Sequence, residues 1–154
     1  MERSILKIEN IRSFIENSTD SRIGKIKRKF AFNIDDIKGL ESIILVDDSI
    51  VRGNTMKYII QILKEINPLI KIHVRIGSPA LIRGCHFGID LYDDELIVPQ
   101  VVKMGLTLEE YFGIESVIFL DRERLNAIFQ DYGMGNCGWC FGIDDAINKS
   151  VYEW

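Results

Sequence analysis

The sequence predicts an α/β fold with a mostly parallel sheet flanked by helices, and three adjacent segments carry this prediction. The segment 42–46 is a continuous apolar run, which is typical of a parallel strand covered on both faces. The segment 55–66 has apolar residues at helical spacing and stops at Asn67-Pro68. The segment 70–76 then alternates apolar and polar residues, as a half-buried strand does. Together these segments predict a β-α-β unit.

The later part of the chain continues to alternate between helix and strand, with weaker periodicity. The expected elements are a helical stretch beginning at 94–97, a capping box of Thr107 and Glu110 before a short helix, a strand over 116–120, a helix over 122–132 with Leu125, Ile128 and Phe129 facing inward, and a loop over 133–142. The last segment contains four glycines, which favour a loop over a helix or strand.

Composition excludes several classes of protein. The chain has 154 residues, of which 47% are hydrophobic and 27% charged, so it is long enough for one domain with a core. No apolar run reaches the ~20 residues of a membrane span, and the net charge of −4 argues against nucleic acid as a partner. The first residues lack the apolar stretch of a signal peptide. We therefore expect a cytoplasmic protein with no membrane or nucleic-acid partner.

Positive charge gathers near the start of the chain. The excess over residues 1–38 is carried mostly by five side chains: Arg22, Lys25, Lys27, Arg28 and Lys29. Two interpretations stay open. The segment is either a solvated loop or a mobile basic segment that meets an anionic ligand.

The segment Asp47 to Thr55 lies where the first clear strand passes into its helix, and it has the features of an anion site. In open α/β sheets, ligands bind at the carboxyl ends of strands, and the N–H groups of a helix N-terminus attract anions. Ser49, Asn54 and Thr55 add hydroxyl or amide donors, and Gly53 lets the backbone approach a ligand closely. This segment can hold a phosphate without a lysine.

Asp47 and Asp48 require a different explanation, because two carboxylates repel a nearby phosphate unless something neutralises them. The hydroxyl pair of a sugar would do so, and so would Mg²⁺, which favours a few carboxylates together with substrate oxygens. The segment therefore predicts a site for a phosphorylated sugar. The alternative is a polar loop in which Asp48 or Ser49 merely caps the helix.

The segment 47–55 resembles the motif that binds phosphoribosyl pyrophosphate (PRPP) in type I phosphoribosyltransferases. Three further segments, 72–79, 85–90 and 137–141, resemble the C-terminal part of amidophosphoribosyltransferase, the glutamine–PRPP amidotransferase that makes phosphoribosylamine in the first step of purine synthesis. Upstream, Lys7 and the run Arg12-Ser13-Phe14-Ile15 resemble the flexible loop that closes over PRPP in that family. The resemblance spans roughly residues 5–145.

The resemblance implies roles for single residues. Asp47 and Asp48 would lie at the ribose hydroxyls, with or without Mg²⁺ between them. The 5-phosphate would be held by the remainder of the motif: Ser49, Ile50, Val51, Arg52, Gly53, Asn54 and Thr55. Asn54 replaces the usual Thr of the family and keeps a donor. Ammonia would displace pyrophosphate from C1, while the acids and the metal stabilise positive charge on the ribose.

It also implies a partial phosphoribosyltransferase domain over 1–154. The expected parts are a flexible basic loop region over 1–40, a PRPP-binding β-α-β core over 41–104 and a C-terminal helical and cysteine-bearing segment over 105–154. We expect no glutaminase domain and no strand that grips pyrophosphate. Catalysis would then need a homo-oligomer or a companion chain. The alternative is a non-catalytic PRPP-sensing protein or an inactive remnant.

The three cysteines leave several interpretations open. Cys137 and Cys140 have metal-ligand spacing, with a redox pair as the competitor, and Cys85 alone would be a small buried hydrophobe. One subgroup of the family holds a [4Fe–4S] cluster on four cysteines, and all three residues match its ligands. The resemblance thus implies a cluster whose fourth ligand lies elsewhere, or zinc with a water or histidine.

Overall fold

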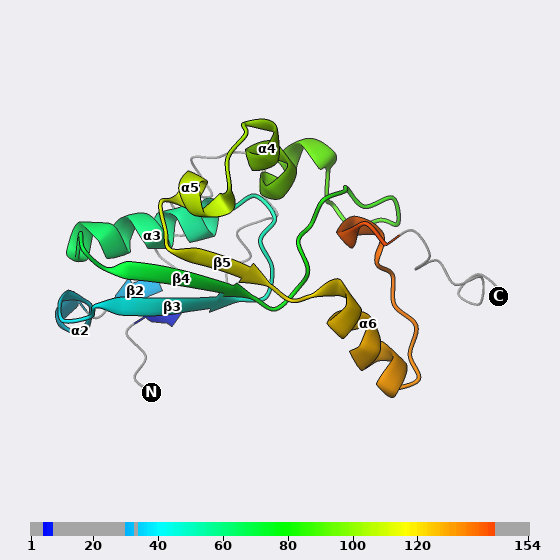
Figure 1. The fold of residues 1–154 in the computed structure, drawn as a ribbon, viewed down its shortest axis with the longest axis horizontal. Helices are drawn as coiled ribbons and strands as arrows, with labels where there is room; N and C mark the ends of the chain where they lie inside the picture. Colours follow the sequence, from blue (N-terminus) through cyan, green and yellow to red (C-terminus); the bar gives the residue numbers. More distant parts are fainter. Residues whose placement is uncertain (1–4, 8–29, 33, 144–154) are drawn as a thin grey trace. The chain divides into compact units, whose positions relative to one another are not determined.

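The computed structural model describes residues 5–7, 30–32 and 34–143 (Figure 1). They form two compact units, one of residues 5–7, 30–32, 34–43 and 53–72 and one of residues 44–52 and 73–143. The boundary crosses the two strands β3 (Ser42–Asp47) and β4 (Lys71–Ile76). A three-stranded sheet with helices confirms the α/β fold.

The first unit contains a two-stranded ribbon and two helices. Strand β1 (Ile5–Lys7) pairs antiparallel with β2 (Phe30–Phe32), and α2 (Ile34–Lys38) follows. Helix α3 (Asn54–Ile66) matches the predicted helix, and its buried stripe of Met56, Ile59, Ile60 and Leu63 has the expected helical spacing. The sequence did not predict β1, β2 or α2.

Asn67 explains why α3 ends where it does. Its side-chain amide donates hydrogen bonds to the carbonyl oxygens of Ile37 (3.2 Å) and Leu40 (2.9 Å) at the end of α2, and Pro68 cannot continue a helix. The five basic side chains between Arg22 and Lys29 and the segment 12–15 lie outside the described residues.

The sheet has the strand order β3-β4-β5, with β5 at Ser116–Phe119. Strands β4 and β5 are parallel, with Val74 opposite Val117 and Arg75 opposite Ile118, and the N–H of Gly77 donates to the carbonyl of Asp47 at 2.9 Å. The parallel strands place the ends of β3, β4 and β5 at one edge.

The two faces of this sheet differ. Val74 and Ile76 are buried, whereas Ile44 and Val46 on β3 are 60% and 75% exposed and Ile118 on β5 is 54% exposed. The prediction that the segment 42–46 is covered on both faces is therefore wrong for one face. A continuous apolar run shows that a strand can be buried on both faces. Whether it is buried depends on other segments that pack against each face.

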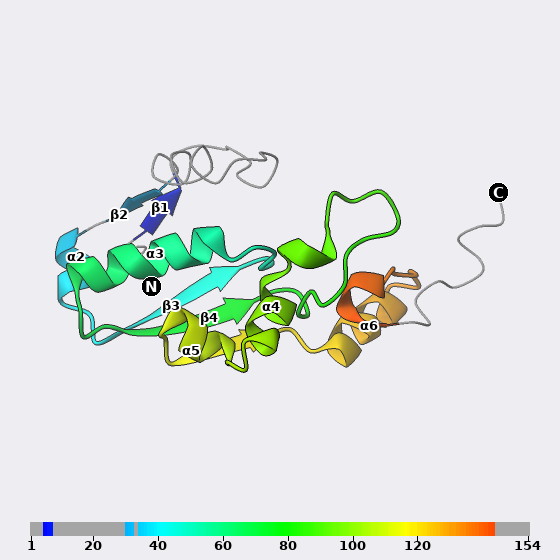
Figure 2. The same cartoon turned by 90° about the horizontal axis from the view of Figure 1, so that it is seen from above.

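The remaining elements belong to the second unit: a 3₁₀ turn η1 (Asp93–Glu95), α4 (Ile97–Lys103), α5 (Leu108–Phe112), α6 (Arg122–Asp131) and a 3₁₀ turn η2 (Trp139–Phe141). Helices α4 and α5 lie side by side in both views (Figures 1 and 2). Each described helix is too short or too polar to cross a lipid bilayer.

Two predictions about these helices have different outcomes. The capping box is confirmed, because Thr107 Oγ1 accepts from the N–H of Glu110 (3.1 Å) and Glu110 Oε2 accepts from the N–H of Thr107 (2.8 Å). The inward face of α6 is wrong for Ile128, which is 48% exposed, and no residue of α6 is fully buried. The spacing of apolar residues in α6 is typical of a helix that packs against a core. The described residues bury its apolar face only in part.

Candidate functional site

Asp47 and Asp48 lie together at the carboxyl end of β3. One oxygen of Asp47 accepts a hydrogen bond from the N–H of Asp48 at 3.0 Å, and one oxygen of Asp48 accepts from the N–H of Ser49 at 2.9 Å. Gly77, at the end of the neighbouring strand β4, holds the carbonyl of Asp47. These bonds fix the backbone that carries the acid pair. The side chain of Asp48 is exposed to solvent.

Helix α3 begins directly after this segment, and its N-terminus is open. Gly53 is the N-cap residue with φ 73°, a left-handed conformation that suits glycine. No side chain caps the helix and its first turn has no acidic residue. Among the described residues, no acceptor receives the N–H groups of Ile50, Gly53 and Asn54. Such N–H groups are the usual binding site for an anion.

This geometry excludes the alternative in which Asp48 or Ser49 caps α3, because the helix has no side-chain cap. The acid pair instead accepts hydrogen bonds from the backbone of the same loop, six and seven residues before α3 starts at Asn54. Asn54 and Thr55 occupy the first turn of α3. The loop and the helix start are contiguous in the chain, and the unit boundary falls between Arg52 and Gly53.

The middle of the segment is held by a region that the sequence did not assign to the site. The carbonyl of Val51 accepts a hydrogen bond from the N–H of Ile97 at 2.9 Å, and Arg52 forms an ion pair with Glu95. Glu95 belongs to η1, more than forty residues later in the chain. The run of acidic residues at 93–95 is the sequence feature that indicates a partner for Arg52. It does not show which basic residue these acids bind.

The three cysteines lie in the second unit, close to one hydrophobic cluster. Cys85 and Cys140 pack against Leu81, Leu91 and Leu96, whereas Cys137 is exposed. Burial raises the pKa of the Cys140 thiol above its usual value, and the nearby thiols of Cys137 and Cys85 contribute further to this rise in pKa. The structure thus brings the three side chains into one neighbourhood, as their resemblance to a ligand set implies.

Proximity alone does not make a metal site. Within the described residues, no three Cys, His, Asp or Glu side chains are arranged so that they could hold a metal ion. The cysteines therefore do not fit an iron–sulfur cluster or zinc in this arrangement. The pair Asp47 and Asp48 fits Mg²⁺, because this ion binds through one or two carboxylates and takes its other ligands from water and substrate oxygens.

Trp139, between the two C-terminal cysteines, helps to attach their segment to the rest of the unit. Its Nε1–H donates to the carbonyl of Gly84 at 3.0 Å, and the guanidinium of Arg83 lies 5.0 Å from the ring centroid. A Cβ on Gly84 would lie 2.9 Å from the carbonyl oxygen of Leu91, so only glycine fits there. The backbone of Cys140 also holds the segment, because its carbonyl accepts hydrogen bonds from the N–H groups of Ile82 (2.8 Å) and Arg83 (3.2 Å).

His73, on β4, takes part in a polar network with the neighbouring strand β5. Its Nδ1 lies 2.9 Å from the hydroxyl of Ser116, and Arg75 donates to the same hydroxyl at 3.0 Å. Arg75 also donates to the carbonyl of Val74 at 2.7 Å. This polar network ties β4 to β5.

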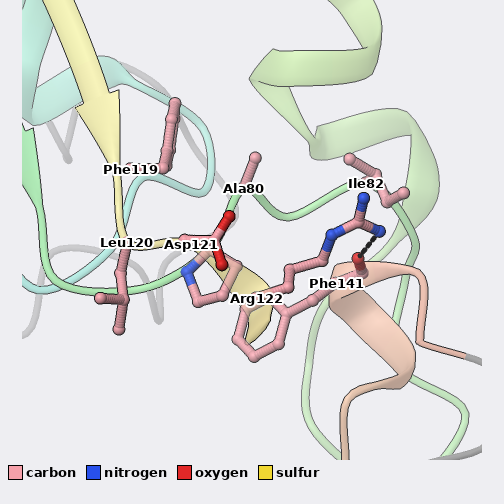
Figure 3. A pocket seen from close by; sticks show the side chains of 8 residues that line it. Ala80, Ile82, Phe119, Leu120, Asp121, Arg122 and Phe141 are labelled. Atoms are coloured by element: carbon pink, nitrogen blue, oxygen red, sulfur yellow. Dashed lines mark hydrogen bonds between the residues drawn. The ribbon is translucent and has the colours of Figure 1, made fainter. Parts of the chain in front are cut away.

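A shallow pocket of about 310 Å³ lies after the ends of β4 and β5 (Figure 3). Its lining is largely apolar, with Ile82, Phe119 and Phe141 around it. Arg122 at its rim donates to the carbonyl of Phe141 at 3.1 Å, and Asp121 caps α6. Both charged side chains therefore serve the protein's own backbone. The pocket offers no group that the sequence marked for chemistry.

The chain is similar in sequence to known amidophosphoribosyltransferases. No protein-family model matches the chain. Amidophosphoribosyltransferase from Homo sapiens is 37% identical over 120 residues, which cover 78% of this chain and 23% of that protein. The Archaeoglobus fulgidus enzyme is 34% identical over 132 residues, which cover 84% and 27%. The chain thus spans about a quarter of the length of the curated relatives it matches.

Solved structures agree with the sequence matches. The glutamine PRPP amidotransferase from B. subtilis, complexed with ADP and GMP, has a TM-score of 0.63 and 30% identity; the match covers 92% of this chain and 31% of that one. A solved structure of the allosteric regulatory enzyme of purine biosynthesis has a TM-score of 0.62 and 28% identity; the match covers 94% of this chain and 33% of that one. Both support the expected fold.

Proposed function

We propose that this chain, which resembles the C-terminal part of amidophosphoribosyltransferases, binds PRPP through the segment Asp47 to Thr55. The observation that carries the proposal is the acid pair at the end of β3, followed within a few residues by the open N-terminus of α3. The acid pair suits the hydroxyls of a ribose, and the N-terminus of α3 suits a phosphate. Their order along the chain matches a phosphoribosyl group.

In this proposal, Asp47 and Asp48 receive hydrogen bonds from the ribose hydroxyls. The backbone N–H groups between Ile50 and Asn54 and the side chains of Ser49 and Thr55 hold the 5-phosphate. Bound Mg²⁺ would reduce the negative charge between the acids and the ligand. When pyrophosphate leaves C1, positive charge develops on the ribose, and the two carboxylates stabilise it.

Calorimetric titration with PRPP tests this proposal, with and without Mg²⁺. The decisive variant is Asp47→Asn/Asp48→Asn, and the matched control is Asp90→Asn/Asp94→Asn, which removes the same charge from exposed positions. We expect Mg²⁺-sensitive binding by the wild type and the control, and loss of binding in the decisive variant. Absence of wild-type binding at millimolar PRPP would contradict the proposal.

Release of pyrophosphate distinguishes an enzyme from a PRPP-sensing protein. The proposed contacts to phosphate and ribose can form without any contact to pyrophosphate. The chain also spans only about a quarter of the length of its relatives. Pyrophosphate would be measured in the presence of PRPP, Mg²⁺ and ammonium. Release that disappears in Asp47→Asn/Asp48→Asn indicates an amidophosphoribosyltransferase-like activity. Binding without release favours the regulatory alternative.

We also propose that the chain works with a further polypeptide, either a second copy or a companion, bound against β3. Strand β3 is first in the strand order of the described sheet, and Ile44, Val46 and Ile118 leave apolar surface exposed on one face. Parallel sheets are normally covered on both faces, and an open edge invites pairing.

Sedimentation velocity of the purified chain tests this association. Val46→Lys places a charge on the exposed face, and Val102→Lys is the control, because Val102 is 68% exposed on α4. We expect concentration-dependent association by the wild type and Val102→Lys, and a monomer for Val46→Lys. A wild-type chain that stays monomeric at all concentrations would count against a second copy, and failure to co-purify with any companion would then remove the proposal.

A further inference from the structure

The segment 47–55 is attached to a distant part of the second unit at two consecutive residues. The carbonyl of Val51 accepts from the N–H of Ile97, and the side chain of Val51 packs against the cluster of Leu81, Leu91 and Leu96. Leu96 and Ile97 immediately follow Glu95 in the chain. The backbone bond, the apolar contact and the ion pair of Arg52 therefore all join the same two segments.

The ion pair between Arg52 and Glu95 lies mostly out of solvent. Nη2 of Arg52 donates to Oε2 of Glu95, and the two side chains are 13% and 29% exposed. Glu95 closes the turn η1, where its N–H donates to the carbonyl of Tyr92 at 3.1 Å. A shielded ion pair loses much more when one partner is removed than an exposed pair does. Glu95 thus fixes where the guanidinium of Arg52 lies.

This placement matters because a guanidinium can also bind a phosphate directly, and Arg52 belongs to a segment that suits a phosphate. With Glu95 present, the guanidinium is paired with a carboxylate outside the segment. In the proposed site, the phosphate is then bound by the backbone N–H groups of the segment.

We infer that Glu95 is a positioning residue for the phosphoribosyl site: it anchors Arg52, so that Arg52 shapes the segment through its backbone and its side chain does not contact the phosphate. The inference rests on the proposed function. In this inference, η1 and the start of α4 hold the segment 47–55 in the conformation that binds the ligand.

The experiment uses Glu95→Ala, Arg52→Ala, their double variant and the charge swap Arg52→Glu/Glu95→Arg in the full chain. Asp94→Ala is the matched control, because Asp94 lies in the same turn, carries the same charge and is exposed. PRPP and ribose 5-phosphate affinities are measured by calorimetry, and exchange of the amides of residues 49–55 by mass spectrometry.

We expect Glu95→Ala and Arg52→Ala each to weaken PRPP binding by about tenfold, because the ion pair acts as a unit. The double variant should be no worse than either single variant, and the charge swap should recover most of the affinity. Amide exchange over 49–55 should accelerate in both single variants and stay unchanged in Asp94→Ala. A purely structural role would lower the unfolding temperature without accelerating exchange in folded protein.

Two results would overturn the inference. If the side chain of Arg52 contacts the phosphate, Arg52→Ala weakens binding while Glu95→Ala leaves it unchanged or strengthens it. If Glu95 does not anchor the segment, its removal leaves exchange over 49–55 unchanged. The exchange measurement needs no ligand, so it decides the anchoring role even where wild-type chain fails to bind PRPP, a result that would refute the proposed function alone.

Discussion

The N-termini of α3 and α6 differ in how their free N–H groups are used. Asp121 caps α6, where its carboxylate accepts from the N–H groups of Glu123 (2.9 Å) and Arg124 (3.2 Å). Helix α5 is closed in a similar way by its capping box. Helix α3 starts at Gly53 with no side-chain cap and no acidic residue in its first turn.

In the proposed function, the start of α6 is capped for stability, whereas the start of α3 binds the phosphate. Capping residues satisfy the orphan N–H groups within the protein and typically contribute about 1 kcal/mol. Helix α3 gives up that contribution at the carboxyl end of a parallel strand, where α/β proteins bind ligands. We infer that its N–H groups are kept for an external anion, so capping α3 should gain stability and lose binding.

The largest expected effect follows from Asn54→Asp, which adds a carboxylate to the first turn of α3. The negative charge should stabilise the helix by about 0.3–1 kcal/mol through its dipole. It should weaken PRPP binding at least about tenfold, because like charges ~4 Å apart repel by roughly 1–4 kcal/mol. Urea denaturation and calorimetry measure the two effects.

Gln130→Glu controls for the added charge, since Gln130 is exposed near the end of α6. It should leave PRPP affinity unchanged. Equal affinities of Asn54→Asp and wild type would show that the N-terminus of α3 does not face the phosphate.

A smaller effect is expected at α6, where Asp121→Ala removes the N-cap. The free energy of unfolding should fall by about 1 kcal/mol, because two N–H groups lose their acceptor. Asp121→Ser retains a capping oxygen and should recover most of this loss. Urea denaturation gives both values. An alanine variant as stable as the wild type would mean that the closed start of α6 does not stabilise the protein.

The smallest effect concerns the charge of Glu110 in the capping box of α5. Hydrogen bonds with Thr107, first to its backbone N–H and then with its side chain, lower the pKa of Glu110 below its usual value of 4.5. A carboxylate whose pKa is lowered on folding contributes stability above the pKa of the unfolded chain, and the contribution is lost as the pH falls through the folded pKa.

Glu110→Gln keeps the capping hydrogen bond and removes the charge. The wild type should therefore unfold at a slightly higher temperature than the variant at pH 7, and the difference should become smaller as the pH is lowered to 3. Thermal unfolding at both values checks this. A difference that persists unchanged at pH 3 would assign the effect to packing and not to the carboxylate.

Local patterns explain which predictions are confirmed. The helix over 54–66 follows from apolar spacing and the stop at Asn67-Pro68, and the box of Thr107 and Glu110 needs only residues three apart. The short helix α2 and the ribbon of β1 and β2 were not predicted, because such short elements show little periodicity. Their formation depends on contacts such as those of Asn67 with Ile37 and Leu40.

The α/β class, the acid pair at a strand end and the start of the next helix could be predicted from the sequence, because these features depend on neighbouring residues and a fixed backbone period. Three outcomes became visible only in the folded chain: Glu95 holds Arg52, Trp139 attaches the cysteine segment at Gly84, and one face of the sheet stays exposed. Each of these outcomes joins residues many positions apart. Sequence spacing carries no information about such pairings, since many partners of equal chemistry are available until the chain has packed.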